Sequence, residues 1–160
     1  MNSSFETVRD LYNLNTGLFL KALENVKDSD LFFRPFDKAN SLHWVAGHLV
    51  TSRYTSANIL GIDDACPWGK MFDFGAEVKE QSVYPAVEEL KTAWQDVSAK
   101  MIDRFNVVTD EDLAGDPPFE IPGMESTKAA AVAFLIFHEA YHVGQLAYIR
   151  RLRGYDRLVG

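Results

Sequence analysis

A long helix-forming run near the C-terminus places polar side chains at positions where a helical bundle needs apolar ones. Residues 127–153 are rich in Ala, Leu, Val, Ile and aromatic residues, and Gly154 follows them. Side chains spaced three or four residues apart share one face of a helix. On this segment that face consists of Ala131, Leu135, His138, His142, Gln145, Ile149 and Leu152. Such a stripe must be covered by other helices, so we expect its polar members inside the structure.

Two histidines of this stripe have the spacing of a metal site. His138 and His142 lie four residues apart, one helical turn along the same face, with Cβ atoms about 6 Å apart. Buried imidazoles are unfavourable unless their nitrogens are satisfied. One divalent metal ion can be reached by both rings, so the spacing predicts a metal site. The alternative is two core histidines bonded to carbonyl groups or water.

Three more segments have helical periodicity, and strand patterns are scarce. We expect helices from Ser3 or Ser4 to about Val26, from Ser41 to about Leu60, from Pro85 through Phe105, and from Ser126 or Thr127 to Arg153. A short helical turn is expected at 109–112 and a loop at 115–123. Long helices that each carry an apolar stripe predict an all-α four-helix bundle, a single domain of residues 1–160.

The connection of residues 61–84 is long for a compact domain, and segments of that length are often functional. It carries Cys66, Trp68 and Phe72 among other apolar side chains. Two interpretations stay open: a lid or interface segment, or a surface excursion packed by its own aromatic residues.

Composition excludes several classes of function. A formal net charge of −7 and a pI of about 5.0 disfavour nucleic-acid binding, which depends on Lys and Arg. The single cysteine, Cys66, excludes an internal disulfide and suits a reducing compartment. No basic segment followed by an apolar run opens the sequence, and the apolar run 129–137 is too short for a membrane span. We therefore expect a cytoplasmic protein with no nucleic-acid or membrane partner.

Metal sites with an open position commonly use three protein ligands, so a third ligand is needed. His48 is expected in the middle of a helix beside Val45 and Leu49, where it can face another helix. His43 lies about 140° away around the same helix, so the two histidines cannot point at one ion. We select His48 because it is deeper, and we expect His43 at the rim or surface.

The sequence HEAYH also matches the HExxH pattern of zinc metalloproteases, which take a third ligand downstream. The extended form of that pattern has Gly and His where this chain has Gln145 and Tyr148. No glutamate follows Glu139, and Asp156 is the only acidic residue after it. The pattern therefore does not favour a protease.

Two histidine-containing segments resemble a known family. Residues 41–49, SLHWVAGHL, resemble the second helix of the DinB superfamily, and residues 30–35 before them also fit. Residues 138–152 begin with HEAYHVGQ, which is similar to the HxxxHxGQ signature of that family. The resemblance extends along the whole chain in order and spacing.

The resemblance implies an up-down-down-up four-helix bundle with metal ligands at His48, His138 and His142. Characterised members of the family include metal-dependent transferases that use the thiols bacillithiol or mycothiol, and many members form homodimers. The family name refers to induction by DNA damage and implies no chemistry on DNA. We therefore expect a homodimer that acts on a small molecule with the help of a low-molecular-weight thiol.

Three functional hypotheses follow for a three-imidazole site holding zinc or nickel, or alternatively manganese or iron. The first is a thiol S-transferase acting on a small electrophile. The second is a metal-dependent hydrolase of a small amide or ester, with Glu139 as candidate catalytic base. The third is a non-catalytic, metal-stabilised binding protein related to stress.

Two further features of the last helix each allow two interpretations. Gln145, one turn beyond His142, either orients a ligand or fills a polar gap. The last helix also has a second face of aromatic residues, which we interpret as core or dimer interface rather than as a substrate box. Its members are Phe134, Phe137, Tyr141 and Tyr148.

Overall fold

Helices account for nearly all the regular structure of the chain, and they begin and end close to the residues expected. The structure, a computed structural model, describes residues 3–77 and 79–160. Its elements are α1 (Ser3–Leu23), α2 (Asp28–Leu31), α3 (Leu42–Ile59), the 3₁₀ turn η1 (Gln81–Val83), α4 (Val87–Val107), α5 (Asp110–Ala114) and α6 (Lys128–Leu152). The predicted domain of residues 1–160 includes residues 1–2 and 78, which lie outside the described part.

Local side-chain chemistry sets most of these boundaries. The hydroxyl groups of Ser41 and Thr127 accept hydrogen bonds from backbone N–H groups in the first turns of α3 and α6. Gly61 and Gly154 follow the same two helices with φ of 87° and 85°, a conformation that glycine adopts without strain. The predicted ends of both helices are thereby confirmed.

The other two long helices differ from prediction by a few residues. α1 ends at Leu23 rather than near Val26, because Asn25 takes a left-handed φ of 56°. α4 begins at Val87 rather than at Pro85, because the residue between them keeps an extended backbone with ψ of 149°. Neither difference changes which side chains face the core.

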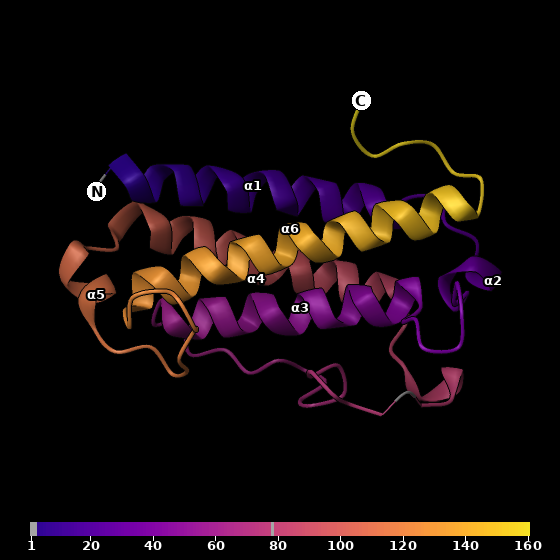
Figure 1. The fold of residues 1–160 in the computed structure, drawn as a ribbon, viewed down its shortest axis with the longest axis horizontal. Coiled ribbons are helices and arrows are strands. Elements are labelled where there is room, and N and C mark those ends of the chain that lie inside the picture. Colours follow the sequence, from indigo (N-terminus) through magenta and orange to yellow (C-terminus); the bar gives the residue numbers. More distant parts are fainter. Residues whose placement is uncertain (1–2, 78) are drawn as a thin grey trace.

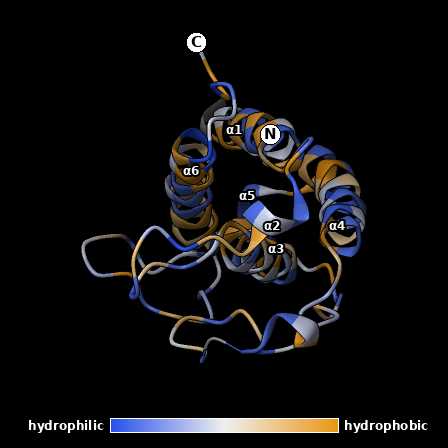
Figure 2. Cartoon of the chain, turned by 90° about the vertical axis from the view of Figure 1, so that its right-hand side faces the viewer, coloured by the Kyte–Doolittle hydropathy of each residue, from blue (hydrophilic) through white to orange (hydrophobic). Residues whose placement is uncertain are grey.

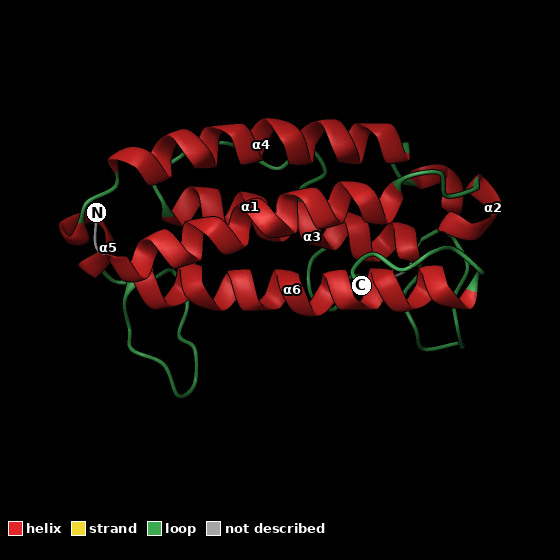
Figure 3. Cartoon of the chain, turned by 90° about the horizontal axis from the view of Figure 1, so that it is seen from above, coloured by secondary structure: helices red, strands yellow, loops and turns green. Residues whose placement is uncertain are grey.

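The helices form a bundle with up-down-down-up topology, as the resemblance implied. α1 and α6 run in one direction, and α3 and α4 run in the other (Figure 1). α6 packs against both α1 and α3, and α4 packs against the same two helices on the opposite side. Viewed along the bundle, the four helices surround a common core (Figure 2), and the view from above shows their nearly parallel alignment (Figure 3). Since α3 and α4 are parallel, residues 60–86 must cross the length of the bundle to join them.

The apolar stripe of α4, one of those expected of the long helices, faces the core. Its buried members are Leu90, Trp94, Val97, Met101 and Phe105, while Val87 is only half-buried. Phe19 of α1 stacks on Trp94 with ring centroids 4.2 Å apart, so aromatic packing joins α1 and α4 at the centre of the bundle.

The stripe predicted for α6 is rotated relative to the true core face. Glu139 is fully buried, whereas Leu152 is 47% exposed. The two histidines of α6 predicted as metal ligands are half-buried and lie at the flank of the buried face that points to α3. The centre of that face holds Leu135, Glu139 and Leu146, because α6 must contact both α1 and α3.

The aromatic face of α6 is not core. Phe137, Tyr141 and Tyr148 are 65%, 58% and 64% exposed, and Phe134 is half-buried. Of the two interpretations, core is wrong for Phe137, Tyr141 and Tyr148, which project from the side of α6 opposite Glu139, whereas Phe134 packs against the core. A dimer interface stays a prediction.

In the described residues, no helix combines the length and the apolar character that crossing a bilayer requires.

Candidate metal centre

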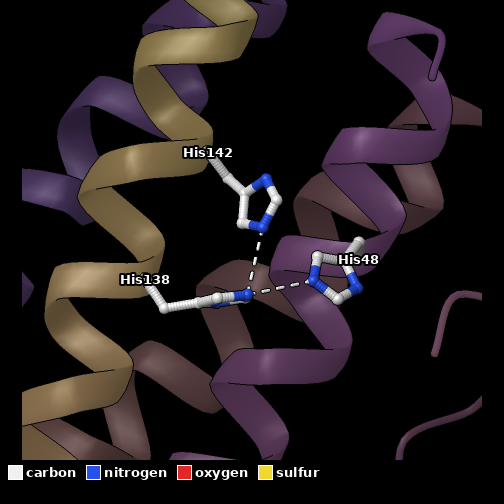
Figure 4. A group of neighbouring side chains, drawn as sticks. All are labelled: His48, His138 and His142. Carbon is white, nitrogen blue, oxygen red and sulfur yellow. Dashed lines mark hydrogen bonds between the residues drawn. The ribbon is translucent and has the colours of Figure 1, made fainter. Parts of the chain in front are cut away.

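Three histidines from two antiparallel helices converge on one point. His48 of α3 faces His138 and His142 of α6, and the three rings point their Nε2 atoms toward one another (Figure 4). The Nε2 atom of His138 lies 3.2 Å from that of His48 and 3.0 Å from that of His142. All three candidate ligand atoms lie within 4.8 Å of one another. The structure thus brings together the three residues predicted as metal ligands.

Two of the three rings have their protonation pattern set by a hydrogen bond on the far side. His48 Nδ1 lies 2.7 Å from the carbonyl oxygen of Phe72, and a carbonyl only accepts, so Nδ1 carries the proton. His142 Nδ1 lies 2.7 Å from Oε1 of Gln145, which accepts in the same way. Both Nε2 atoms therefore present lone pairs toward His138. Metal-binding histidines are commonly oriented by such partners.

A metal ion would satisfy the ring nitrogens of the three histidines better than hydrogen bonds among the rings can. A neutral His138 has one ring N–H and can satisfy only one of the two lone pairs that face its Nε2 atom. A cation at the point of convergence satisfies all three nitrogens. His138 Nδ1 is buried without a hydrogen-bond partner among the described residues, so, unlike in His48 and His142, no acceptor behind the ring holds a proton on Nδ1.

Electrostatics keep the three rings neutral, as metal binding requires. Burial and the neighbouring His142 and His48 rings lower the pKa of His138 to about 4. Burial also lowers the pKa of His48 and of His142, although the hydrogen bonds to Phe72 and Gln145 oppose that shift. At neutral pH none of the three imidazoles carries a charge that would repel a cation.

Aromatic side chains and a groove surround the histidines. Trp44 stacks on His48 with ring centroids 5.2 Å apart, and Tyr141 contacts His142 edge-on at 5.0 Å. A groove of about 520 Å³ lies beside the site, between the loop of residues 35–40 and α6. Gln145, which orients His142, lines it together with Tyr141. The three histidines do not line the groove, which offers room for a small molecule beside Gln145 and Tyr141, the two side chains that contact His142.

Glu139, the candidate catalytic base, has another partner. Its two carboxylate oxygens accept hydrogen bonds from Nε and Nη2 of Arg53, both at 2.6 Å. Neither side chain is more than 1% exposed. Burial raises the pKa of the Glu139 carboxyl, and the Arg53 guanidinium opposes that rise. A catalytic role for Glu139 stays a prediction, and this geometry favours a structural one.

His43 is not at the surface, so that expectation is wrong. It is 1% exposed, its ring stacks on Phe32 with centroids 4.8 Å apart, and Nε2 donates to the carbonyl oxygen of Pro85 at 2.8 Å. The reason is that the segment leading into α4 covers this side of α3. As predicted from the angle between them, His43 does not join His48 in the cluster.

Sequence reasoning missed two contributors to this region. The carbonyl of Phe72 has no sequence signal, because any residue supplies a carbonyl and the irregular backbone decides where it points. Arg53 did leave a signal. It lies four residues after Leu49, and Glu139 lies four residues after Leu135, so opposite charges stand at helical spacing from apolar residues on two helices, and both are buried.

The fold and the site define a class of protein: a helical bundle in which two antiparallel helices bring three histidines together as a candidate metal site. The family model described as the DinB superfamily matches residues 11–146. This chain belongs to the DinB superfamily.

Two solved structures from Bacillus subtilis show the same fold. YfiT, described as a probable metal-dependent hydrolase with an unusual four-helix bundle topology, aligns with a TM-score of 0.74 and 15% identity, covering 98% of this chain and 91% of its own. The DinB-like protein YjoA aligns with a TM-score of 0.64 and 17% identity, covering 94% of each chain. No curated protein sequence matches the chain. At these identities the likeness shows the fold alone.

Proposed function

We propose that this protein is a metal-dependent enzyme that transfers a low-molecular-weight thiol to a small electrophilic molecule. The observation that carries the proposal is the convergence of three neutral imidazoles, two of which are held with their Nε2 lone pairs facing the third. His48, His138 and His142 would hold the ion. Zinc or nickel suits nitrogen ligands best, and manganese or iron is the alternative.

A divalent ion held by three imidazoles supplies an open coordination position and enough charge to deprotonate a thiol at neutral pH. The protein supplies the geometry. Phe72 and Gln145 hold two of the rings in place, and the groove beside Gln145 and Tyr141 gives a small electrophile access to the region. The transferred sulfur would form its new bond to the electrophile as a leaving group departs or a ring opens.

The composition of the cluster, which is all histidine, favours thiol chemistry over hydrolysis, although Asp73 lies near enough to raise the pKa of His48. Among the described residues, the three-histidine cluster includes no Asp or Glu, and Glu139 is held by Arg53. Attack by water is commonly assisted by a general base, whereas a coordinated thiol is already deprotonated.

Hydrolysis of a small amide or ester is the second candidate. It is favoured by the similarity in fold to YfiT, which is described as a probable metal-dependent hydrolase. Three-histidine zinc sites are also known to activate water. A third outcome is a metal-stabilised bundle that binds its ligand without chemistry.

The test begins with metal analysis of protein purified without a metal-affinity tag, followed by zinc and nickel titration. The metal-loaded protein is then assayed with an aryl halide acceptor and cysteine, glutathione, bacillithiol or mycothiol. Conjugation that requires a thiol and is lost in His142→Ala supports the transferase. Ester or amide turnover without thiol supports the hydrolase. Metal that only raises the melting temperature leaves the binding protein, and failure to bind metal contradicts all three.

We also propose that the protein is a homodimer, a question separate from the chemistry. The support is the row of exposed aromatic residues on α6, formed by Phe137, Tyr141 and Tyr148. Exposed apolar surface of this kind is typical of an interface. Analytical ultracentrifugation would show a dimer that Phe137→Ser weakens, and a wild-type monomer at all concentrations would contradict the proposal.

A further inference from the structure

The crossover segment between the parallel helices α3 and α4 enters the core at one residue. The ring of Phe72 is fully buried, although its neighbours along the chain are exposed or half-buried. It stacks on Tyr84 with centroids 5.4 Å apart and contacts Trp68 edge-on at 6.4 Å. Both partners belong to the connection itself, and the ring of Phe72 also faces His43 of α3, with ring centroids 6.3 Å apart. The backbone carbonyl of Phe72 bonds His48 Nδ1.

The ring of Phe72 packs directly on the backbone of α3 at Gly47, the residue before His48; this packing is called the seated state of the ring. A Cβ atom at position 47 would lie 2.4 Å from Cε1 of Phe72, far inside van der Waals contact. The ring cannot move aside easily, because it is fully buried and is stacked on Tyr84. Only glycine therefore lets the ring of Phe72 approach α3 as closely as it does.

We propose that Phe72 is a positioning residue for the metal site: its ring seats on Gly47, and this seating brings its carbonyl to His48 Nδ1. The inference rests on the proposed metal site. When the ring is seated, His48 has its proton on Nδ1 and its lone pair toward His138 and His142. When the ring is displaced, His48 loses its acceptor and is free to change tautomer and rotamer.

Metal binding and docking of the crossover segment are consequently coupled. A ligand that prefers the docked state must itself favour docking, because linkage between two equilibria is reciprocal. Loss of a hydrogen-bond partner behind a metal-binding histidine typically weakens metal binding about 10-fold to 100-fold. The same factor should appear as protection of the crossover segment when metal is bound.

The first experiment compares two glycines that each lie within two residues of a ligand histidine. Gly47→Ala forces the ring of Phe72 away, whereas a Cβ added at Gly144 in α6 meets nothing within 4 Å. Zinc affinity is measured by competition with a chromophoric chelator, and helix content by circular dichroism. We expect about 10-fold to 100-fold weaker zinc binding for Gly47→Ala. Gly144→Ala should bind zinc like the wild type.

The outcomes separate this inference from the proposed function. If the wild type does not bind zinc, the metal site itself is wrong. If the wild type binds zinc and a folded Gly47→Ala binds it equally well, the site stands and the role of Phe72 is overturned.

The second experiment needs no variant and covers the case in which Gly47→Ala does not fold. Lys70 and Lys79 flank Phe72 and are exposed, so trypsin can report opening of the crossover segment. Zinc should slow cleavage at these two sites by about the coupling factor, 10-fold to 100-fold. Cleavage at the exposed Arg157 in the C-terminal tail should not change. Equal rates at Lys70 and Lys79 with and without zinc, in a protein that binds zinc, would overturn the coupling.

Discussion

Two polar clusters join α3 to α6, and they differ in how many of their polar atoms have hydrogen-bond or ion-pair partners. One is the ion pair of Arg53 and Glu139, deep in the core. The other is the group of three histidines at the flank of the same two helices. In the ion pair every strong group has a partner: besides Glu139, the Arg53 guanidinium donates to Thr16 and Ser98, and it lies 3.8 Å over the ring of Trp94.

In the histidine cluster, by contrast, some polar atoms have no partner. Its nitrogens face one another, its rings are neutral, and the Nδ1 atom of His138 has no partner among the described residues. A buried polar network in which every group has a partner stabilises and specifies a fold. An incomplete network leaves polar atoms whose burial is unfavourable unless a ligand satisfies them. The comparison supports a structural role for Glu139 and the proposed metal-binding role for His138 beside it in sequence.

The largest effect is expected from breaking the ion pair on one side. Arg53→Met leaves the Glu139 carboxylate buried and unpaired, which should lower the free energy of unfolding by about 3–5 kcal/mol. Urea denaturation measures it. The double variant Arg53→Met/Glu139→Leu should recover most of the loss, because neither member of the pair then leaves an unpaired charge. A single variant as stable as the wild type would show that the pair is not needed for stability.

Removing one histidine should change the stability of the metal-free protein little and should instead reduce the stability gained on adding zinc. We expect His142→Ala to leave the metal-free protein nearly as stable as the wild type, since this side chain is half-buried. The wild type should gain about 2.7 kcal/mol at a zinc concentration 100 times its Kd, and the variant should gain far less at that concentration. Thermal unfolding with and without zinc measures both quantities. Equal gains in the two proteins would exclude His142 as a ligand.

Gln145 offers a finer test of how the cluster is oriented. Gln145→Leu removes the acceptor behind His142 and should weaken zinc binding about 10-fold to 100-fold. Gln145→Glu keeps an acceptor at the same place and should bind zinc at least as tightly as the wild type. Zinc competition titrations of the two variants measure both affinities. If Gln145→Leu binds zinc as tightly as the wild type, Gln145 only fills a gap and does not orient His142.

A last test concerns the acid sensitivity of the metal-free protein. The folded pKa of His138 is lowered to about 4 from an ordinary value of 6.5, so between these values the unfolded chain binds more protons than the folded one. Stability should therefore be full above about pH 6.5 and fall as the pH drops toward 4. Urea midpoints across this range measure the slope, and His138→Asn should flatten it. A midpoint independent of pH would contradict the lowered pKa.

Much of the fold was predictable because it depends on local chemistry. Helix-capping Ser41 and Thr127, the terminating glycines after α3 and α6, and the apolar stripe of α4 are all visible as short-range patterns. The i, i+4 pair His138 and His142 was likewise readable, because helical geometry alone places both rings on one side.

What could not be predicted depends on contacts distant in sequence. The rotation of α6 that buries Glu139 is decided by its simultaneous packing on α1 and α3, which no single stripe reveals. His43 is buried by the segment leading into α4, 42 residues away at Pro85. The bond from His48 to Phe72 depends on the path of an irregular segment and on a main-chain atom that every residue possesses.

The most direct test of the metal centre is a crystal structure of the zinc-loaded protein with anomalous data collected at the zinc edge. The account predicts one anomalous peak, about 2.0–2.1 Å from Nε2 of each of His48, His138 and His142. No peak at the cluster in a zinc-saturated crystal, or an ion bound there without His48, would contradict it.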